Sequence, residues 1–235
     1  MFSIIIPSFN NIDYLKVAIE SLKKNSFFKN EIIIHLNIGT DGSAEYLRLN
    51  DIKFTLTDYN SGICEGVNMA SKLAKMEYIC YAHDDFYFCP NWDKFLHDEI
   101  INIGHNKFYF SGSTIGTFGN SLECGDSFDN FNENKFLKEY NQIKFKDLQG
   151  STWAPHVVHK SLWDKVGGFS EEFFPGAGSD PDFNMKLWNI GVRLFKGLGN
   201  CRVYHFSSLS LRKKAWNNGA KTFLLKWGIS IKFFK

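Results

Sequence analysis

The chain of 235 residues has few cysteines, few prolines and no long hydrophobic run. Its five cysteines are scattered and form no Cys-x-x-Cys pair, which argues against a zinc cage or a disulfide framework and favours a reducing compartment. No apolar run approaches the roughly 20 residues of a membrane-spanning helix. The N-terminus has no basic segment before its short apolar run, so it does not look like a signal peptide. We therefore expect a cytoplasmic protein.

Acidic residues are absent from the last part of the chain. From Phe183 to Lys235 there are eleven Lys and Arg residues and no Asp or Glu, whereas the first 182 residues carry 25 acidic and 16 basic groups. A basic tail covers phosphate groups, lies on an anionic membrane, or forms a solvated face. We expect residues 206–235 to contact the inner face of a membrane peripherally, and we expect no nucleic-acid partner.

Hydrophobic periodicity predicts alternating strands and helices, the pattern of a βαβ sheet. Strands are predicted at 2–6, ended by Pro7, and at 32–36, 52–57, 78–82, 108–110 and 201–205, and another strand begins after Trp153. Helices are predicted at 12–22, with Asn10 or Asn11 as N-cap, and at 63–75, 92–100, 182–189 and in the basic tail. Residues 119–150 show no clear period, and their phenylalanines suggest a long loop that packs on the body as a lid.

Two pairs of carboxylates lie beside turns. Asp84 and Asp85 follow a buried strand, and Asp180 and Asp182 flank Pro181 at the start of a helix. Carboxylates at the exit of a buried strand are costly unless they are paired, hydrogen-bonded or holding a metal. Mg²⁺ and Mn²⁺ accept a few carboxylates together with phosphate oxygens, so the first pair predicts a cation site and the second a proton acceptor. The simpler alternatives, a turn and a helix N-cap, stay open.

Polar residues also follow other predicted strands. Pro7, Ser8 and Phe9 end the first strand at the edge where open α/β sheets bind ligands, and the Phe9 ring offers a face for a base. Asn60, Gly62 and Asn68 suit ribose or phosphate contacts, although Asn60 could equally cap a helix. His205 closes an apolar strand and is either a structural histidine or a metal ligand. A dinucleotide fingerprint and a P-loop are both missing.

The order of seven motifs resembles the family 2 glycosyltransferases of GT-A fold. They are Ile4–Asn10, Asn37–Ser43, Asn60–Gly62 with Asn68, His83–Asp85, Gly167–Phe174, Ser179–Asp182 and Val203–His205. The resemblance extends to about His205, and Lys221–Gly228 is similar to some members. It implies an α/β, GT-A-like fold with a Rossmann-type mixed, mostly parallel sheet, flanking helices and a C-terminal helical tail. Residues 1–110 would bind the nucleotide sugar, 111–205 would bind the acceptor and carry catalysis, and 206–235 would form the basic tail.

The resemblance also implies an activity and a set of site residues. A sugar would pass from a UDP- or GDP-type donor to a hydroxyl of a glycan or lipid-linked acceptor, by an inverting single displacement assisted by Mn²⁺ or Mg²⁺. The implied catalytic base is Asp180, the donor-binding residues are Pro7, Ser8, Phe9, Asn37, Asn60, Gly62, Asn68, His83 and Asp84, the metal ligands are Asp84, Asp85 and His205, and the acceptor-side residues are Trp153 and Asp182.

Three positions depart from the family pattern. Ala82 stands at the first Asp of the Asp-x-Asp motif, Asn37 replaces an Asp that contacts the base, and Ser179 replaces the Glu before the catalytic Asp. These exchanges motivate an alternative, a catalytically silent protein of the same fold that binds a nucleotide sugar or a glycan. A sugar-phosphate nucleotidyltransferase would need a Gly-rich basic loop after the first strand, and the sequence has none there.

Overall fold

The computed structural model describes residues 1–116, 122, 124–150, 153–207 and 218–234. Its strands are β1 (Phe2–Phe9), β2 (Glu31–Asn37), β3 (Lys53–Thr57), β4 (Tyr78–Tyr81), β5 (Phe86–Phe88), β6 (Phe108–Ile115), β7 (Leu148–Gln149), β8 (His156–His159) and β9 (Leu194–His205). Its α-helices are α1 (Ile12–Asn25), α2 (Ser43–Leu49), α3 (Gly62–Ser71), α4 (Trp92–Ile103), α5 (Glu133–Glu139), α6 (Lys160–Val166), α7 (Ser179–Asn189) and α8 (Gly219–Trp227). Short 3-10 helices are η1 (Tyr140–Gln142), η2 (Glu171–Phe173) and η4 (Ile231–Phe234).

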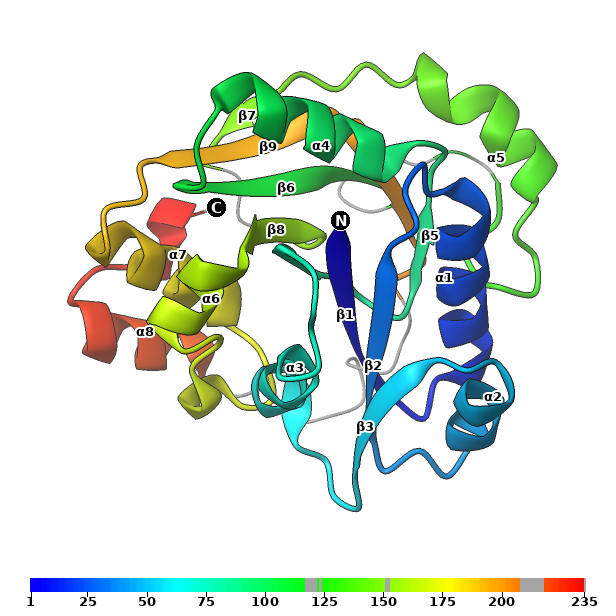
Figure 1. Cartoon of the computed structure of the whole chain (residues 1–235), viewed down its shortest axis with the longest axis horizontal. Helices are drawn as coiled ribbons and strands as arrows, with labels where there is room; N and C mark the ends of the chain where they lie inside the picture. Colours follow the sequence, from blue (N-terminus) through cyan, green and yellow to red (C-terminus); the bar gives the residue numbers. More distant parts are fainter. Residues whose placement is uncertain (117–121, 123, 151–152, 208–217, 235) are drawn as a thin grey trace.

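The strands form a mixed sheet in the order β3-β2-β1-β4-β8-β6-β9-β5, with β7 paired to β9 (Figure 1). β1, β2, β3, β4, β6 and β9 run in one direction, and β8, β5 and β7 run in the other. In Figure 1, α1 and α2 lie to the right of the sheet and α6, α7 and α8 to the left. The predicted α/β fold, with a mostly parallel sheet, flanking helices and a helical tail, is confirmed.

One hydrophobic core joins the two halves of the chain. The apolar residues of β1 and β2 are buried almost without interruption, as expected for parallel strands covered on both faces. The core extends from Phe2 through Phe110 and Phe183 to Phe223 in α8. The division at 110 and 205 into donor, acceptor and tail regions therefore stays a prediction about function. Among the described residues, no helix combines the length and the apolar composition needed to cross a membrane.

The first strand does not stop at Pro7, as the sequence predicted, but continues to Phe9. β4 pairs with β1 only as far as Ile5, whereas β2 accompanies β1 to its end. Pro7 therefore lies beyond the ladder with β4, where its missing N–H leaves no gap in that pairing. Because β1 is longer than predicted, Ser8 and Phe9 stand at the carboxyl edge of the sheet.

The cap of α1 comes from a distant turn. Asn11 occupies the N-cap position, but its side chain makes no capping hydrogen bond. Instead, the Asp41 carboxylate accepts hydrogen bonds from the backbone N–H of Ile12, at 2.8 Å, and of Ser43, at 3.1 Å. One side chain from the turn after β2 therefore satisfies the starts of both α1 and α2.

The segment predicted as a long loop, 119–150, contains α5, η1 and β7, and its residues 119–121 and 123 lie outside the described part of the chain. A second cluster of buried side chains packs this segment on the sheet, through Phe136 and Tyr140 against Tyr87, Tyr204 and Phe206. The prediction that the phenylalanines pack on the body is thus confirmed for the described residues. The predicted role as a lid stays a prediction.

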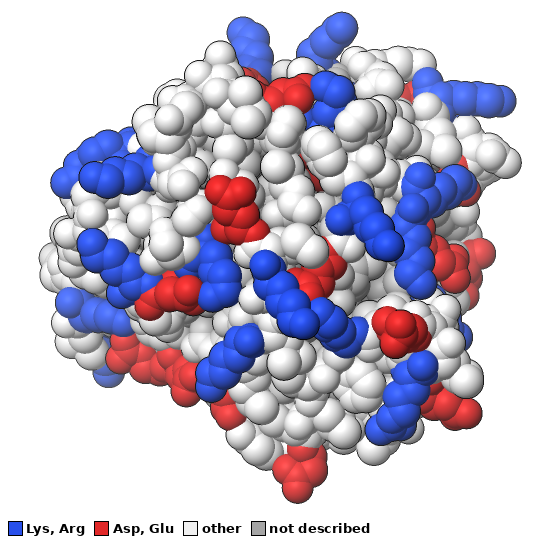
Figure 2. Space-filling view, in the orientation of Figure 1, with Lys and Arg blue, Asp and Glu red and all other residues white. Residues whose placement is uncertain are grey.

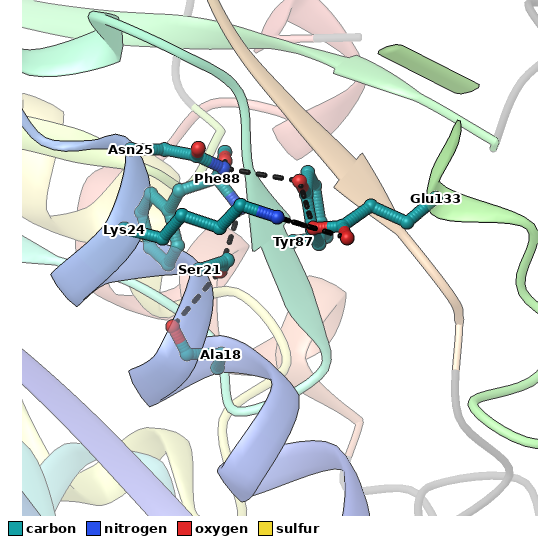
Figure 3. Close-up of polar contacts among 7 residues, drawn as sticks. All are labelled: Ala18, Ser21, Lys24, Asn25, Tyr87, Phe88 and Glu133. Atoms are coloured by element: carbon teal, nitrogen blue, oxygen red, sulfur yellow. Dashed lines mark hydrogen bonds and ion pairs between the residues drawn. The ribbon is translucent and has the colours of Figure 1, made fainter. Parts of the chain in front are cut away.

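A buried polar network ties α1 and α5 to β5 (Figure 3). Asn25 donates hydrogen bonds to Tyr87 Oη, at 3.1 Å, and to the Phe88 carbonyl, at 2.7 Å. Tyr87 Oη donates to Glu133 at 2.7 Å, and Lys24 pairs with the same carboxylate at 2.8 Å. Because β5 directly follows Asp85 in the chain, this network also fixes the position of that carboxylate.

We expect Asn25→Ala to lower the free energy of unfolding by about 1–3 kcal/mol, because the buried Phe88 carbonyl and Tyr87 hydroxyl lose a donor. Lys24→Ala is the matched control: it removes an exposed ion pair of the same network and should cost less than about 1 kcal/mol. Urea unfolding measures both. Equal losses in the two variants would contradict the importance given to the buried bonds.

Candidate active site

The carboxyl ends of β1, β4 and β9 meet at one edge of the sheet. β4 ends at Tyr81, and the chain turns back through Ala82–Asp85 into β5. Phe86, the first residue of β5, pairs with His205, the last residue of β9. The ladder therefore places Asp85 beside His205, although 120 positions separate them in the sequence.

His83, Asp85 and His205 form a group whose potential ligand atoms all lie within 4.8 Å of one another. The Asp85 carboxylate is 3.3 Å from His205 Nε2 and 4.0 Å from His83 Nδ1, and it is nearly buried. The ring of Phe86 holds both imidazoles, stacked on His83 and edge-on to His205. Two predicted metal ligands, Asp85 and His205, are thus together, and His83, predicted as a donor-binding residue, joins them.

Burial shifts the pKa values of His83 and of the neighbouring Asp84. It lowers the pKa of the His83 imidazole to about 4, with a further contribution from the positive form of His205. It raises the pKa of the Asp84 carboxyl to about 7, and the neighbouring Asp85 charge adds to this effect. Hydrogen bonds from Ser8 and Asn11 to Asp84 act in the opposite direction, because they favour the charged carboxylate.

Asp84 faces the end of β1. Ser8 Oγ donates a hydrogen bond to Asp84 Oδ2 at 2.6 Å, which joins the first strand to the turn after β4. Pro7 and Phe9 are half-buried beside Ser8 at the same edge. The structure therefore brings four of the predicted donor-side residues together. Ligation of a metal by Asp84 stays a prediction, since its carboxylate lies outside the group of His83, Asp85 and His205.

Asp180 is the second residue of α7, and its side chain is 22% exposed. Its Oδ1 atom lies 3.7 Å from Nε2 of the buried His156, at the start of β8. The Tyr81 ring lies between the two clusters, with its centroid 5.0 Å from that of His156 and 5.4 Å from that of His83. The charge of Asp180 acts on both Tyr81 and His83. Asp180 with His156 and the group of His83, Asp85 and His205 therefore lie on either side of Tyr81.

The predicted donor-binding asparagines bind the protein itself. Asn37 is buried, and its Oδ1 accepts hydrogen bonds from the backbone N–H of Ser61, at 2.8 Å, and from its hydroxyl, at 2.7 Å. Asn60 Oδ1 accepts a bond from the N–H of Gly62 at 3.1 Å. Asn68 exchanges two bonds with the backbone of Phe169. Contact of these side chains with a nucleotide sugar stays a prediction.

Two glycines allow close approaches between α3 and the Gly167–Phe174 segment. At Gly62, which has φ +71°, a Cβ atom would lie 2.8 Å from the Phe174 ring. At Gly168, which has φ +62°, a Cβ would lie 2.3 Å from Asn68 Oδ1. The Gly167–Phe174 segment is thereby packed directly on α3. This packing explains why these positions need glycine without any ligand.

The two predicted acceptor-side residues lie in different surroundings. Trp153 is 49% exposed and precedes β8. Asp182 is fully buried and accepts hydrogen bonds from Ser170 at 2.6 Å, Trp227 at 2.9 Å and Lys226 at 2.9 Å. These contacts favour an anchoring role for Asp182, which fastens α8 to α7. Its contact with an acceptor stays a prediction.

Sequence reasoning missed His156 and Asn11. Asn11 was predicted only as a cap, but it hydrogen-bonds Asp84. His156 follows Pro155 in an apolar stretch, and no pattern marks it. Its pairing with Asp180 depends on β8 lying next to β4, with His156 opposite Tyr81. Only the order of the strands could have revealed it.

Comparison with known proteins places the chain among sugar transferases. The family model described as "Glycosyl transferase family 2" matches residues 3–166. The "Uncharacterized glycosyltransferase RP339" of Rickettsia prowazekii (strain Madrid E) is 28% identical over 178 residues, covering 73% of this chain and 54% of that protein. The "Minor teichoic acid biosynthesis protein GgaA" of Bacillus subtilis (strain 168) is 28% identical over 193 residues, covering 73% of this chain and 41% of that protein. The chain thus spans about half the length of these relatives.

The fold is also that of a solved structure. The crystal structure of S. aureus TarS 1–349 superimposes with a TM-score of 0.66 at 17% identity, covering 87% of this chain and 60% of that one. The family match spans the first strand to the end of α6, which includes the turn with His83, Asp84 and Asp85. On these grounds, the chain belongs to glycosyl transferase family 2.

Proposed function

We propose that this chain transfers a sugar from a nucleoside-diphosphate sugar to an acceptor hydroxyl, with inversion at the anomeric carbon. The proposal rests on one arrangement. Asp180 with His156 lies on one side of Tyr81, and the group of His83, Asp85 and His205 lies on the other. Structures of S. aureus TarS 1–349 were determined in complex with UDP and with UDP-GlcNAc. They support a UDP-type donor over a GDP-type donor for this chain.

The end of β1 and the turn after β4 suit the donor. Phe9 stands at the carboxyl edge of the sheet, where its ring could stack on a base, and the polar groups of Ser8 and Asp84 lie beside it. Asp84, with its pKa raised to about 7, can donate a hydrogen bond to a phosphate or ribose oxygen when protonated and accept one when ionised. The donor would lie along this edge, with its diphosphate toward His83 and His205.

The residues of the His83, Asp85 and His205 group fit a divalent cation. They offer two imidazole nitrogens and one carboxylate within reach of a single ion, and the lowered pKa of His83 leaves its ring neutral and able to ligate at pH 7. This mixed nitrogen and oxygen set suits Mn²⁺ better than Mg²⁺, which prefers oxygen ligands and water. When bound, the cation would neutralise charge on the diphosphate leaving group.

The proposed general base is Asp180, whose side chain is partly exposed at the start of α7. An acceptor hydroxyl is a weak nucleophile at neutral pH, so a carboxylate must take its proton as the new bond forms. The acceptor oxygen bonds to the anomeric carbon, the bond from that carbon to the diphosphate oxygen breaks, and its electron pair leaves with the nucleoside diphosphate. The proton moves to Asp180. Attack from the side opposite the leaving group inverts the anomeric configuration, as in inverting glycosidases.

The C-terminal tail and one relative support the proposal that the acceptor lies at a membrane surface. GgaA is named for minor teichoic acid biosynthesis, which supports a glycan polymer or a lipid-linked saccharide as acceptor. Leu225 of α8 and Phe233 of η4 are exposed by 76% and 81%. Basic side chains gather at the left of the molecule, in the region of α7 and α8, above a row of acidic ones (Figure 2). We propose that α8 and η4 contact the anionic cytoplasmic face of a membrane.

We expect Asp180→Asn to lower kcat by roughly 10²–10⁴-fold, because the amide cannot accept the hydroxyl proton. Binding of UDP should stay within about twofold of the wild-type value. Transfer from a panel of UDP-sugars, followed by release of UDP, measures the first, and calorimetry measures the second. Undiminished transfer by the variant would contradict the role of Asp180, and UDP binding by a wild-type protein without turnover would favour the silent binding protein.

His205→Ala should weaken the Mn²⁺-dependent binding of UDP at least about tenfold, because the cation loses an imidazole ligand. His97→Ala is the matched control, since His97 also lies 3.3 Å from a carboxylate, that of Asp98, but on the exposed side of α4. Calorimetric titrations with and without Mn²⁺ compare the two. If both variants bind UDP as the wild type does, the proposed cation site is wrong.

The membrane contact predicts flotation with vesicles that contain anionic lipid, and loss of flotation in high salt. The double variant Leu225→Ser with Phe233→Ser should bind these vesicles at least about fivefold more weakly, since it removes exposed apolar groups without touching the core. Leu49→Ser, an equally exposed leucine on α2, should have no effect. A wild-type protein that stays with the unbound fraction would rule the contact out.

A further inference from the structure

Two buried polar atoms, one on His156 and one on Asp180, face each other without a hydrogen bond. They are Nε2 of His156 and Oδ1 of Asp180, 3.7 Å apart, and neither has a hydrogen-bond partner among the described residues. His156 is only 1% exposed. Buried polar groups are nearly always paired in folded proteins, so two unpaired polar atoms at this spacing require an explanation.

His156 is held by its neighbours and cannot turn away from Asp180 without displacing them. It begins β8, where it lies opposite Tyr81 of β4 and Ser111 of β6. Its ring contacts the rings of Tyr81, Tyr109, Phe169 and Phe183, with centroids 4.8–5.8 Å apart. An imidazole packed in this way presents Nε2 in a fixed direction.

The other titratable groups that act on or are influenced by Asp180 are neutral near pH 7. Burial raises the pKa of the Cys64 thiol of α3 to about 12, and it raises the pKa of Tyr81 of β4 and Tyr109 of β6 well above their ordinary value. His83, after β4, has a pKa lowered to about 4. None of these neutral groups carries a charge opposite to that of the Asp180 carboxylate, whereas Nε2 of His156 lies 3.7 Å from its Oδ1.

We propose that His156 is a positioning residue for the transfer reaction, whose Nε2–H group donates a hydrogen bond to Oδ1 of Asp180 and turns Oδ2 toward the acceptor hydroxyl. The proposal rests on the role of Asp180 as the base. Because Oδ1 is buried, the acceptor reaches this carboxylate at Oδ2. The proton of the acceptor ends on Oδ2, and His156 keeps its own hydrogen throughout.

The present distance of 3.7 Å is a few tenths of an ångström longer than a hydrogen bond. Hydrogen bonds in active sites are often long without substrate and shorten when the substrate is bound. Asp180 lies in the first turn of α7, so a small movement of that turn toward β8 is enough to close the distance. The bond would then orient the carboxylate at the moment when the acceptor needs it.

A competing explanation is that His156 merely fills an aromatic pocket. His156→Phe separates the two, because a phenyl ring fills the pocket and cannot donate a hydrogen bond. We expect this variant to fold and to bind UDP as the wild type does, but to lose kcat at least about tenfold. The acid limb of its pH–rate profile should move up by about one unit, since a hydrogen bond to the charged carboxylate favours ionisation and is now lost. His156→Gln, whose amide can donate, should recover part of both effects.

His159→Phe is the matched control. His159 ends the same strand and lies 3.6 Å from a carboxylate, that of Glu77, on the surface. It also caps α6, so its replacement lowers stability. Stability loss alone should leave kcat and the pH profile of the folded fraction unchanged. If His156→Phe behaves in the same way, His156 is a packing residue and the proposal is overturned.

A second measurement does not depend on turnover. The ¹³C signal of the Asp180 carboxyl carbon, assigned by its loss in Asp180→Asn, can be titrated in the protein saturated with UDP and Mn²⁺, where the distance to His156 is expected to close. Its midpoint should lie at higher pH in His156→Phe than in the wild type. Equal midpoints would overturn the interaction whether or not the protein transfers sugar. A shifted midpoint in a protein that transfers no sugar would uphold the interaction while the proposed function fails.

Discussion

A buried negative charge at the exit of β4 is the constraint on which this edge of the sheet depends. Asp85 is almost fully buried, and the groups within reach of its carboxylate include His205 and His83. An isolated buried carboxylate is very costly, so the fold must bring a polar partner to it. The pairing of Phe86 with His205 provides this, and it requires β5 to lie at the end of β9. The polar surroundings of Asp85 therefore depend on the strand order that places β5 beside β9.

The same constraint is consistent with the proposed divalent cation. His83 cannot readily become positive, because burial keeps its pKa near 4, and His205 is a single imidazole for a site that also contains Asp84. The proposed divalent ion would compensate both carboxylates at once. With such a cation and the diphosphate of the proposed donor, the charges of the site would be balanced.

Much of this arrangement could be predicted from the sequence, because it is local. Apolar runs in the sequence predicted β1, β2 and β4. The carboxylates that follow β4 predicted the edge of the sheet at which we expect a ligand. Other features depend on pairs that are distant in the chain. Asp41 caps α1 from 29 positions away, α5 is fixed by Tyr87 and Glu133, and His156 meets Asp180 only because β8 inserts beside β4. The amides of Asn37 and Asn68 show a further limit, since an amide that binds backbone and one that binds a ribose have the same sequence signal.

The anchoring of Asp182 gives the C-terminal helix a part in the architecture of the site. Two residues after Asp180, this fully buried carboxylate is neutralised by Lys226 and bonded by Trp227, both from the last turn of α8. A chain cut after His205 would leave that charge uncompensated at the first turn of α7, where the proposed base is carried. The motifs end at His205, but the cooperative folding unit extends to α8. The minimal fragment that preserves the geometry around Asp180 must therefore include Trp227.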